Sequence, residues 1–136
     1  MLIGYTTGTY DLFHQGHVEF LRRARALCDK LIVGVTQDEL GYQEKGRRPV
    51  LGLEERMSVV GACRYVDVVV EHGDRGGDKL EPWKKFHFDI VFIGDDWKDH
   101  PTYTELPNKI PVRVIFLPYT QTISTTKIRQ KLNIGT

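Results

Sequence analysis

The stretch GTYDLFHQGHVEFLRRA, Gly8 to Ala24, links an apolar run to an amphipathic helical pattern. The apolar run Leu2–Tyr5 precedes it, and Val18 and Leu21 recur with helical spacing on one face. A strand that turns into a helix leaves backbone N–H groups exposed at the helix start, where the helix dipole also attracts anions. We therefore predict an anion-binding turn between a first strand and a first helix.

The rest of the chain repeats this alternation. Four more apolar runs indicate strands: Leu31–Val35, Val66–Val70, Ile90–Ile93 and Val112–Leu117. Helical patterns accompany them: His17–Cys28, Leu53–Cys63, Pro82–Phe88 and Ser124–Leu132. The middle runs are rich in Val and Ile and nearly continuous, which is typical of strands buried on both faces of a parallel sheet. We predict an α/β fold, an open parallel sheet of about five strands with helices on both faces, in a single domain over residues 1–136.

Composition narrows the classes of function. The 136 residues carry a formal net charge of +1, so the total charge predicts no nucleic-acid partner. No apolar stretch approaches the ~20 residues that cross a bilayer, and the first residues lack the pattern of a signal peptide, so no membrane partner is predicted. Cys28 and Cys63 form no close-spaced pair, which favours a reduced, cytoplasmic protein, with one disulfide as the alternative.

The two histidines of the opening stretch, His14 and His17, allow three interpretations. Their spacing lets both rings face one site, and imidazole can donate to phosphate oxygens or, when charged, offset negative charge. A metal site is less favoured, because other natural ligands are not clustered nearby and closed zinc sites take four. For an isolated pair, a helix cap with packed rings would be favoured. The phosphate interpretation gains from other anion-binding features predicted at the same edge of the sheet.

That edge is the carboxyl end of the parallel strands, where α/β folds bind ligands. Ile123–Gln130 (ISTTKIRQ) offers hydroxyls and N–H groups at a helix start, and Lys45–Arg48 (KGRR) is a basic loop. In Gly94–Asp99 (GDDWKD), carboxylates could bind a base or ribose and Trp97 could stack on a base. Each segment also has a structural alternative: an ordinary helix cap for Ile123–Gln130, solvent-exposed charge for Lys45–Arg48, and a tryptophan packed on its own loop for Gly94–Asp99. The stretches expected to be irregular are Gln37–Gly52, His72–Lys79 and Lys98–Pro111.

Taken together, these motifs resemble a known family. GTYDLFHQGH resembles the GTFDxxHxGH signature of the HxGH nucleotidyltransferases, and ISTTKIR resembles their second signature. RYVDVVV and GDDW resemble the cytidylyltransferase branch, most closely the glycerol-3-phosphate cytidylyltransferases, and the likeness runs in order across nearly the whole chain. The resemblance implies a Rossmann-like fold, nucleotidyl transfer with release of pyrophosphate, and a homodimer with the RYVD segment near its interface.

The resemblance also implies substrates and site residues. The substrates would be CTP, accompanied by Mg²⁺, and a phosphorylated small alcohol, with glycerol 3-phosphate as the best candidate. Residues acting at the reacting phosphates would be His14, His17, Lys45 and Arg47. Residues binding CTP would be Thr9, Tyr10, Gly16, Arg64, Asp95, Asp96, Trp97, Ser124, Thr125 and Thr126. Residues binding the acceptor would be Asp11, Lys79 and Tyr119, and no metal site built by the protein is predicted.

The chain departs from the family pattern at one place. Members often carry RTxG before ISTT, whereas here Tyr119 replaces the arginine and Thr122 replaces the glycine. This change motivates other acceptors, such as phosphocholine, phosphoethanolamine or an amino-acid or sugar-alcohol phosphate. An adenylyltransferase of the same superfamily and a catalytically weak nucleotide-binding module are the remaining alternatives.

Overall fold

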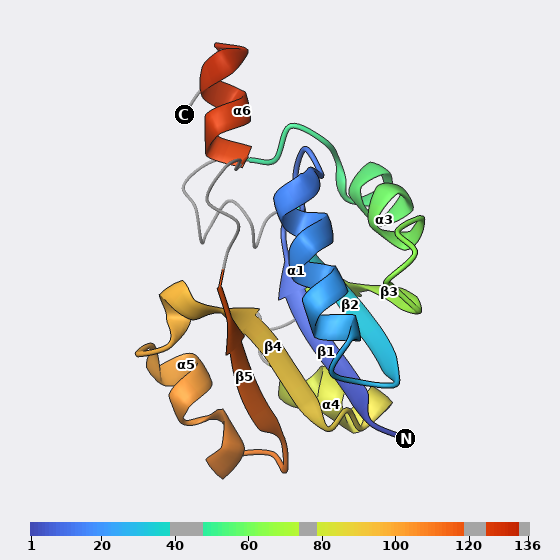
Figure 1. The fold of residues 1–136 in the computed structure, drawn as a ribbon, viewed down its shortest axis with the longest axis vertical. Helices are drawn as coiled ribbons and strands as arrows, with labels where there is room; N and C mark the ends of the chain where they lie inside the picture. The colour runs from blue at the N-terminus through green and yellow to red at the C-terminus, as the bar shows by residue number, and fades with distance from the viewer. Residues whose placement is uncertain (39–47, 74–78, 119–124, 134–136) are drawn as a thin grey trace.

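A computed structural model describes residues 1–38, 48–73, 79–118 and 125–133 (Figure 1). Its centre is a sheet whose five strands all pair in parallel, in the order β3-β2-β1-β4-β5. The strands are β1 Ile3–Gly8, β2 Lys30–Thr36, β3 Val68–His72, β4 Ile90–Gly94 and β5 Arg113–Leu117. The predicted open parallel sheet of five strands is confirmed.

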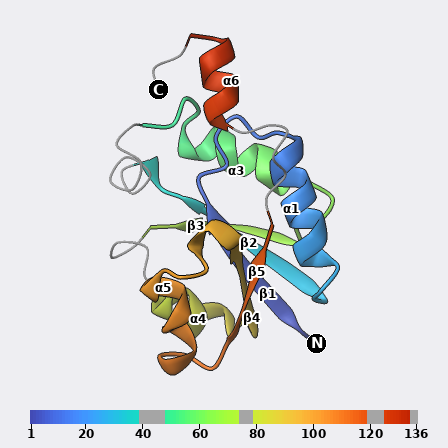
Figure 2. The same ribbon diagram turned by 60° about the vertical axis from the view of Figure 1, so that its left-hand side comes forward.

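Helices cover both faces of this sheet, as predicted (Figures 1 and 2). The helices are α1 Gln15–Arg25, α3 Leu53–Gly61, α4 Leu80–Phe86, α5 Pro101–Thr104 and α6 Thr125–Lys131, with 3-10 turns η2 Asp95–Trp97 and η3 Leu106–Asn108. Helices α1 and α3 lie on one face, and α4 and α5 lie on the other. Helix α6 stands beyond the carboxyl ends of the strands (Figure 1). Within the described ranges, no helix is both long enough and apolar enough to span a bilayer.

The continuous apolar pattern of β2 follows from its place inside the sheet. Successive side chains of a strand point to opposite faces, so Leu31 and Val33 enter the core under α1 while Ile32 enters the core above α4. Both faces are covered, and neither side of the strand needs polar residues. In β1, Gly4 has a similar cause: a Cβ there would lie 2.5 Å from the ring of Phe92.

Two differences from the sequence predictions have local causes. Helix α1 begins at Gln15, before the expected His17, because the His14 side chain caps it. The expected irregular stretch Lys98–Pro111 holds α5 and η3. His100 caps α5 by accepting from Thr102 N at 3.2 Å, and proline follows at the first helical position. Such short turns have no repeating apolar face for a periodicity argument to find.

The alternative of a disulfide between Cys28 and Cys63 is wrong. Both are free thiols: Cys28 is buried at the end of the turn after α1, and Cys63 is half-buried after α3. The Cys28 Sγ contacts the carbonyl of Ala24 at 3.5 Å, and burial raises the pKa of this thiol. Both helices end before their cysteine, at Arg25 and Gly61, so neither thiol lies in the helix predicted for it.

Candidate active site

The loop between β1 and α1 has an unusual backbone. We call residues Thr9–His17 the histidine turn. Within it, Tyr10 and Leu12 have φ angles of 53° and 52°, the left-handed region that non-glycine residues seldom adopt. Thr9, Tyr10 and Asp11 are buried. A strained backbone persists only where the surroundings hold it, so the contacts that hold this turn define the site.

The two histidines cap α1 together. His14 stands at the N-cap, and its Nδ1 accepts from Gly16 N at 3.0 Å. His17 stands three residues later, and its Nδ1 accepts from His14 N at 3.1 Å. This is a reciprocal capping box in which imidazoles replace the usual Ser or Thr and Glu or Gln. The ring centroids lie 3.9 Å apart and the planes are stacked.

The capping contacts determine where each neutral ring carries its proton. A ring nitrogen that accepts from a backbone N–H is unprotonated, so the neutral form of each ring has its proton on Nε2. Burial also lowers the pKa of His14, which favours the neutral ring at pH 7. The cap and the phosphate interpretations are therefore compatible: Nδ1 holds the helix start, and Nε2–H is a hydrogen-bond donor.

Aromatic neighbours hold the orientation of His17. Its ring stacks on Phe13, with centroids 5.4 Å apart and planes within 12°, and meets the edge of Tyr10 at 5.3 Å. The resemblance implies that the backbone at Tyr10 contacts CTP, and the structure places the Tyr10 side chain in the core beneath the turn.

Asp11 joins three segments of the chain. Its carboxylate accepts from Val50 N at 2.7 Å and Leu51 N at 3.0 Å, and it forms a buried ion pair with Arg129 at 3.1 Å. The hydroxyl of Thr125, at the start of α6, donates to the Asp11 carbonyl at 2.8 Å. The carboxylate of Asp11, which was predicted to bind the acceptor, thus binds backbone N–H groups and Arg129 within the protein. The Thr125 hydroxyl likewise donates its hydrogen bond to the protein's own backbone.

Arg56 is a buried residue of this region that the sequence prediction did not name. Its side chain is 0% exposed. Its guanidinium donates to the carbonyls of Thr9 at 2.7 Å, Thr36 at 2.8 Å and Leu51 at 2.9 Å, and it pairs with Asp38. One side chain therefore ties the carboxyl ends of β1 and β2 to the segment before α3. Its only sequence signal is weak: on α3 it lies four residues before the buried Val60, on the same helix face.

The turn after β4 is packed by rings. We call residues Asp95–Tyr103 the aromatic turn. Asp95 and Asp96 are exposed, whereas Trp97 is half-buried and meets Tyr103 edge-on, with centroids 5.5 Å apart. Trp97 also lies against His100 at 4.9 Å, so it packs on its own loop. The predicted contacts of this turn with cytidine stay predictions.

Lys79 lies immediately before α4 and is buried, 5% exposed. Its ammonium donates to the Tyr103 hydroxyl at 3.2 Å and lies 4.8 Å from the centre of that ring. The predicted acceptor lysine is therefore in contact with the aromatic turn.

The remaining predicted residues are scattered. Arg64 is exposed between α3 and the amino end of β3, with its guanidinium 5.6 Å from the Tyr65 ring, so the structure does not bring it to the carboxyl edge. Gly16 is buried in the first turn of α1, and Thr126 is exposed in the first turn of α6. The predicted residues that lie outside the described ranges are Lys45, Arg47, Tyr119, Thr122 and Ser124.

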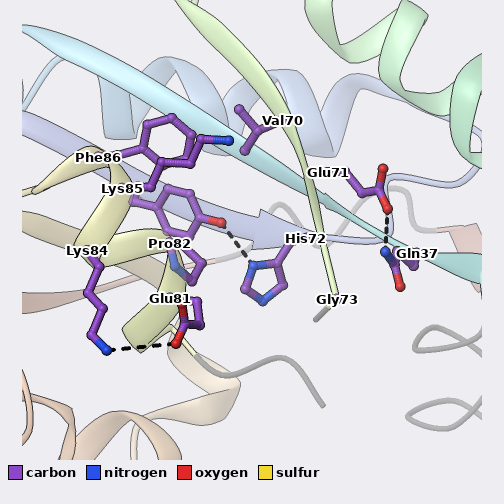
Figure 3. A pocket seen from close by; sticks show the side chains of 11 residues that line it. Gln37, Val70, Glu71, His72, Gly73, Glu81, Pro82, Lys84, Lys85 and Phe86 are labelled. Carbon is purple, nitrogen blue, oxygen red and sulfur yellow. Dashed lines mark hydrogen bonds and ion pairs between the residues drawn. The ribbon is translucent and has the colours of Figure 1, made fainter. Parts of the chain in front are cut away.

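A pocket of about 600 Å³ lies between the end of β3 and α4 (Figure 3). At its base the Tyr5 hydroxyl and His72 Nδ1 are 2.9 Å apart, and burial raises the pKa of Tyr5 so far that its hydroxyl stays protonated. Glu81 and Lys84 form a 3.8 Å ion pair at its rim. Among the described residues, none that was predicted for the site lines this pocket. Over the same ranges, no three His, Cys, Asp or Glu side chains gather as a metal site would require.

The comparisons with known proteins show the family of the chain. Residues 5–131 match the Cytidylyltransferase-like family. The chain is 41% identical to glycerol-3-phosphate cytidylyltransferase of Staphylococcus aureus (strain NCTC 8325 / PS 47), over 93% of this chain and 92% of that protein. It is 43% identical to FAD synthase of Pyrococcus abyssi (strain GE5 / Orsay), over 82% and 77%. Among solved structures, the lipopolysaccharide core biosynthesis protein from Thermoplasma volcanium GSS1 matches with a TM-score of 0.77 and 25% identity, over 89% and 99%.

Proposed function

The chain belongs to the cytidylyltransferase-like family, and on that premise we propose that it transfers a cytidylyl group from CTP to a phosphorylated small alcohol. Pyrophosphate leaves, and the product is a CDP-alcohol. The best candidate acceptor is glycerol 3-phosphate, because the Staphylococcus aureus relative, which matches over 93% of this chain, is named for it. The observation that carries the proposal is the histidine capping box, which gives two Nε2–H donors at a strand-to-helix junction.

The reaction needs no nucleophilic side chain. The acceptor's phosphate is an anion at pH 7 and can attack the α-phosphorus of CTP directly, in line with the leaving pyrophosphate. The protein's task is to align the two substrates and to stabilise the charge that spreads over the phosphoryl oxygens. We assign that stabilisation to His14 and His17, at about 3 kcal/mol for each preorganised donor.

The leaving group has its own proposed partners. Following the family resemblance, the start of α6 would hold the β- and γ-phosphates through Ser124 and the backbone of Thr125 and Thr126. The basic loop would close over them with Lys45 and Arg47. What supports this part is the tie between α6 and the histidine turn, made by the Thr125 hydroxyl and by the buried pair of Arg129 with Asp11.

Mg²⁺ enters this proposal only as a companion of CTP. Bound to the nucleotide, it would neutralise charge on the phosphate oxygens. The described residues offer no cluster of ligands that would hold the ion without the nucleotide, so we derive no step through a protein-bound metal. Asp95 and Asp96 are exposed after β4 and, with Trp97, are the proposed contacts of the nucleoside.

The experiment is a pyrophosphate-release panel that crosses two nucleotides with several acceptors. CTP with glycerol 3-phosphate is expected to give the highest kcat/KM. Phosphocholine, phosphoethanolamine and other alcohol phosphates test whether the chain prefers a different acceptor because Tyr119 replaces the family's arginine. ATP with flavin mononucleotide tests the alternative that the 43% identical FAD synthase favours. Binding of CTP without turnover on any acceptor would contradict the proposal and support a nucleotide-binding module.

Three further properties complete the proposal. Residues 1–136 would act as one catalytic domain, in the cytoplasm, where CTP is made. The chain would form a homodimer with the RYVD segment, Arg64–Asp67, near the interface. In the structure that segment also holds the amino edge of the sheet, because the Asp67 carboxylate accepts from Leu31 N at 2.8 Å and pairs with Arg25 at 3.0 Å. Light scattering of the purified chain measures the oligomeric state.

A further inference from the structure

The pocket between the end of β3 and α4 has a polar base inside an apolar layer (Figure 3). Tyr5 lies in the core that also buries Ile32 and Val91, and its hydroxyl meets His72 Nδ1 at 2.9 Å. Gly34 makes room for this contact, because a Cβ there would lie 2.6 Å from the Tyr5 oxygen. Burying polar groups costs free energy that apolar side chains would not cost, so the polar base favours a pocket that receives a polar ligand.

A second polar pair, Gln37 and Glu71, lines the pocket at the ends of β2 and β3. The Gln37 side-chain amide donates to the Glu71 carboxylate, and the Gln37 backbone N–H donates to the carbonyl of His72 at 2.8 Å. Gly73 leaves space for the Gln37 side chain, because a Cβ at Gly73 would lie 2.9 Å from Gln37 Cγ. The amide oxygen of Gln37 and the carboxylate of Glu71 are hydrogen-bond acceptors, and an alcohol hydroxyl is a donor. The pair is therefore suited to bind hydroxyl groups.

The pocket adjoins the histidine turn. One nitrogen of Arg56, Nη1, donates to the carbonyl of Thr9 at 2.7 Å and to the carbonyl of Thr36 at 2.8 Å. Thr9 begins the histidine turn, and Thr36 directly precedes Gln37. Because the two carbonyl oxygens share one donor, they lie close together at the carboxyl ends of β1 and β2. A molecule whose phosphate reaches the histidine turn can therefore extend its other end toward the pocket.

The strand order separates this pocket from the proposed nucleoside contacts. In the order β3-β2-β1-β4-β5, the pocket follows β2 and β3, whereas the aromatic turn follows β4, on the opposite side of β1. The histidine turn, which follows β1, lies between them. Two substrates that meet at the histidine turn would thus extend to opposite sides of it, which suits a reaction between their phosphates.

The charges of the lining select among acceptors. Glu81 pairs with Lys84 at 3.8 Å, and among the described lining residues Glu71 and Lys85 add one charge of each sign. An ammonium group therefore meets no excess of negative charge. A quaternary ammonium also binds best among exposed ring faces, whereas Tyr5 is 0% exposed. The lining favours a neutral chain with hydroxyl groups.

We propose that this pocket holds the hydroxyl-bearing chain of the acceptor, and that Gln37 and Glu71 bind its hydroxyl groups. The inference rests on the proposed function for the reaction and for the phosphate end of the acceptor. It goes beyond that function by assigning a subsite and by predicting that the chain selects its acceptor through hydroxyl groups.

An acceptor without hydroxyl groups tests the selectivity. n-Propyl phosphate has the carbon chain of glycerol 3-phosphate but no hydroxyl. With CTP as the nucleotide, we expect kcat/KM to be about 100-fold higher for glycerol 3-phosphate, because n-propyl phosphate leaves the polar groups of the pocket without their partners. The difference should lie mainly in the KM of the acceptor, since these contacts are remote from the reacting phosphate.

Two substitutions locate the selectivity in the pocket. Gln37→Met and Glu71→Met keep the length of the side chain and remove its hydrogen-bond acceptors. Each is expected to raise the KM for glycerol 3-phosphate about tenfold and to leave the KM values for n-propyl phosphate and CTP unchanged. The matched control is Glu55→Met, at an exposed position of α3 outside the pocket, which should change none of the three.

A binding measurement gives the same comparison without turnover. The chain is first saturated with α,β-methylene CTP, which cannot release pyrophosphate, and is then titrated calorimetrically with each acceptor. Gln37→Met and Glu71→Met should weaken the binding of glycerol 3-phosphate about tenfold and leave the binding of n-propyl phosphate unchanged.

The outcomes separate this inference from the proposed function. A wild-type chain with equal kcat/KM for the two acceptors, or variants that change both acceptors equally or neither, would overturn the assignment of the pocket. A preference for phosphoethanolamine that Glu71→Met abolishes would likewise replace the hydroxyl chain by a cation. If the wild-type chain releases no pyrophosphate with any acceptor, the proposed function fails, and the titrations alone decide whether the pocket binds hydroxyl groups.

Discussion

The histidine turn and the aromatic turn follow neighbouring strands, β1 and β4, at one edge of the sheet, but different contacts hold them. Directional hydrogen bonds fix the histidine turn, many of them from the buried guanidinium of Arg56 and to the carboxylate of Asp11. Ring packing around Trp97 and Tyr103 holds the aromatic turn. Hydrogen bonds to buried charges fail sharply when one partner is lost, whereas ring packing tolerates change. We therefore expect substitutions in the histidine turn to cost more stability than substitutions in the aromatic turn.

The largest effect expected from this comparison is on stability, at Arg56. Arg56→Ala leaves the carbonyls of Thr9 and Thr36 without their buried donor, and we expect the free energy of unfolding to fall by about 4 kcal/mol. Arg56→Lys keeps the charge but fewer of the bonds, so its loss should be intermediate. Urea unfolding measures both. Arg22→Ala, which breaks an exposed pair with Glu19, is the control and should leave the midpoint unchanged. A wild-type midpoint for Arg56→Ala would mean that these hydrogen bonds do not stabilise the histidine turn.

The next effect is on catalysis, at the capping histidines. Asn can cap a helix, and Gln at the third helical position can complete a capping box, so His14→Asn and His17→Gln keep the helix start but lose Nε2–H. We expect each to lower kcat about 10²- to 10³-fold while the melting temperature changes little. Pyrophosphate release and thermal unfolding of the same samples test this. Full turnover in either variant would remove that histidine from the proposed mechanism.

A smaller effect is expected in the aromatic turn. Trp97→Phe shortens the edge contact with Tyr103 without leaving a buried charge unpaired, and we expect a loss of about 1 kcal/mol in the free energy of unfolding. The KM for CTP should rise if Trp97 stacks on the base as proposed. Isothermal titration with CTP separates the two effects. A loss as large as that of Arg56→Ala would erase the difference between the turns.

The smallest effect is a pH dependence of stability. Burial lowers the pKa of His14 below its ordinary value of 6.5, so the unfolded chain takes up the proton first as the pH falls. The stabilisation of the folded state by the neutral His14 ring is therefore complete above about pH 6.5. It decreases as the pH falls from there toward the lower pKa of His14 in the folded state. Urea midpoints between pH 7.5 and 5 should show a shallower decrease for His14→Asn than for the wild type. Identical slopes would mean that the cap does not depend on the neutral ring.

The features that could be predicted from the sequence are those with a repeating apolar pattern or a local motif. The continuous apolar runs predicted the buried strands. The strand-to-helix junction was also predicted, with the histidine cap as the alternative to the phosphate interpretation, which stays a prediction. The contacts of Arg56 and Tyr103 could not be predicted, because a charged or aromatic residue in a short helix gives no sign of which distant carbonyl or ammonium it meets. Arg64 shows the opposite limit: a motif identified the residue, but the turn before β3 places it at the amino edge of the sheet.

The pair of Arg129 with Asp11 joins residues that are 118 positions apart in the chain. During synthesis, β1 and the histidine turn leave the ribosome before α6 is made. Asp11 can therefore form its ion pair with Arg129 only at the end of synthesis. Closing so long a loop is a slow, entropically costly step. The part of the site that would bind pyrophosphate can therefore be completed only after α6 has been synthesised.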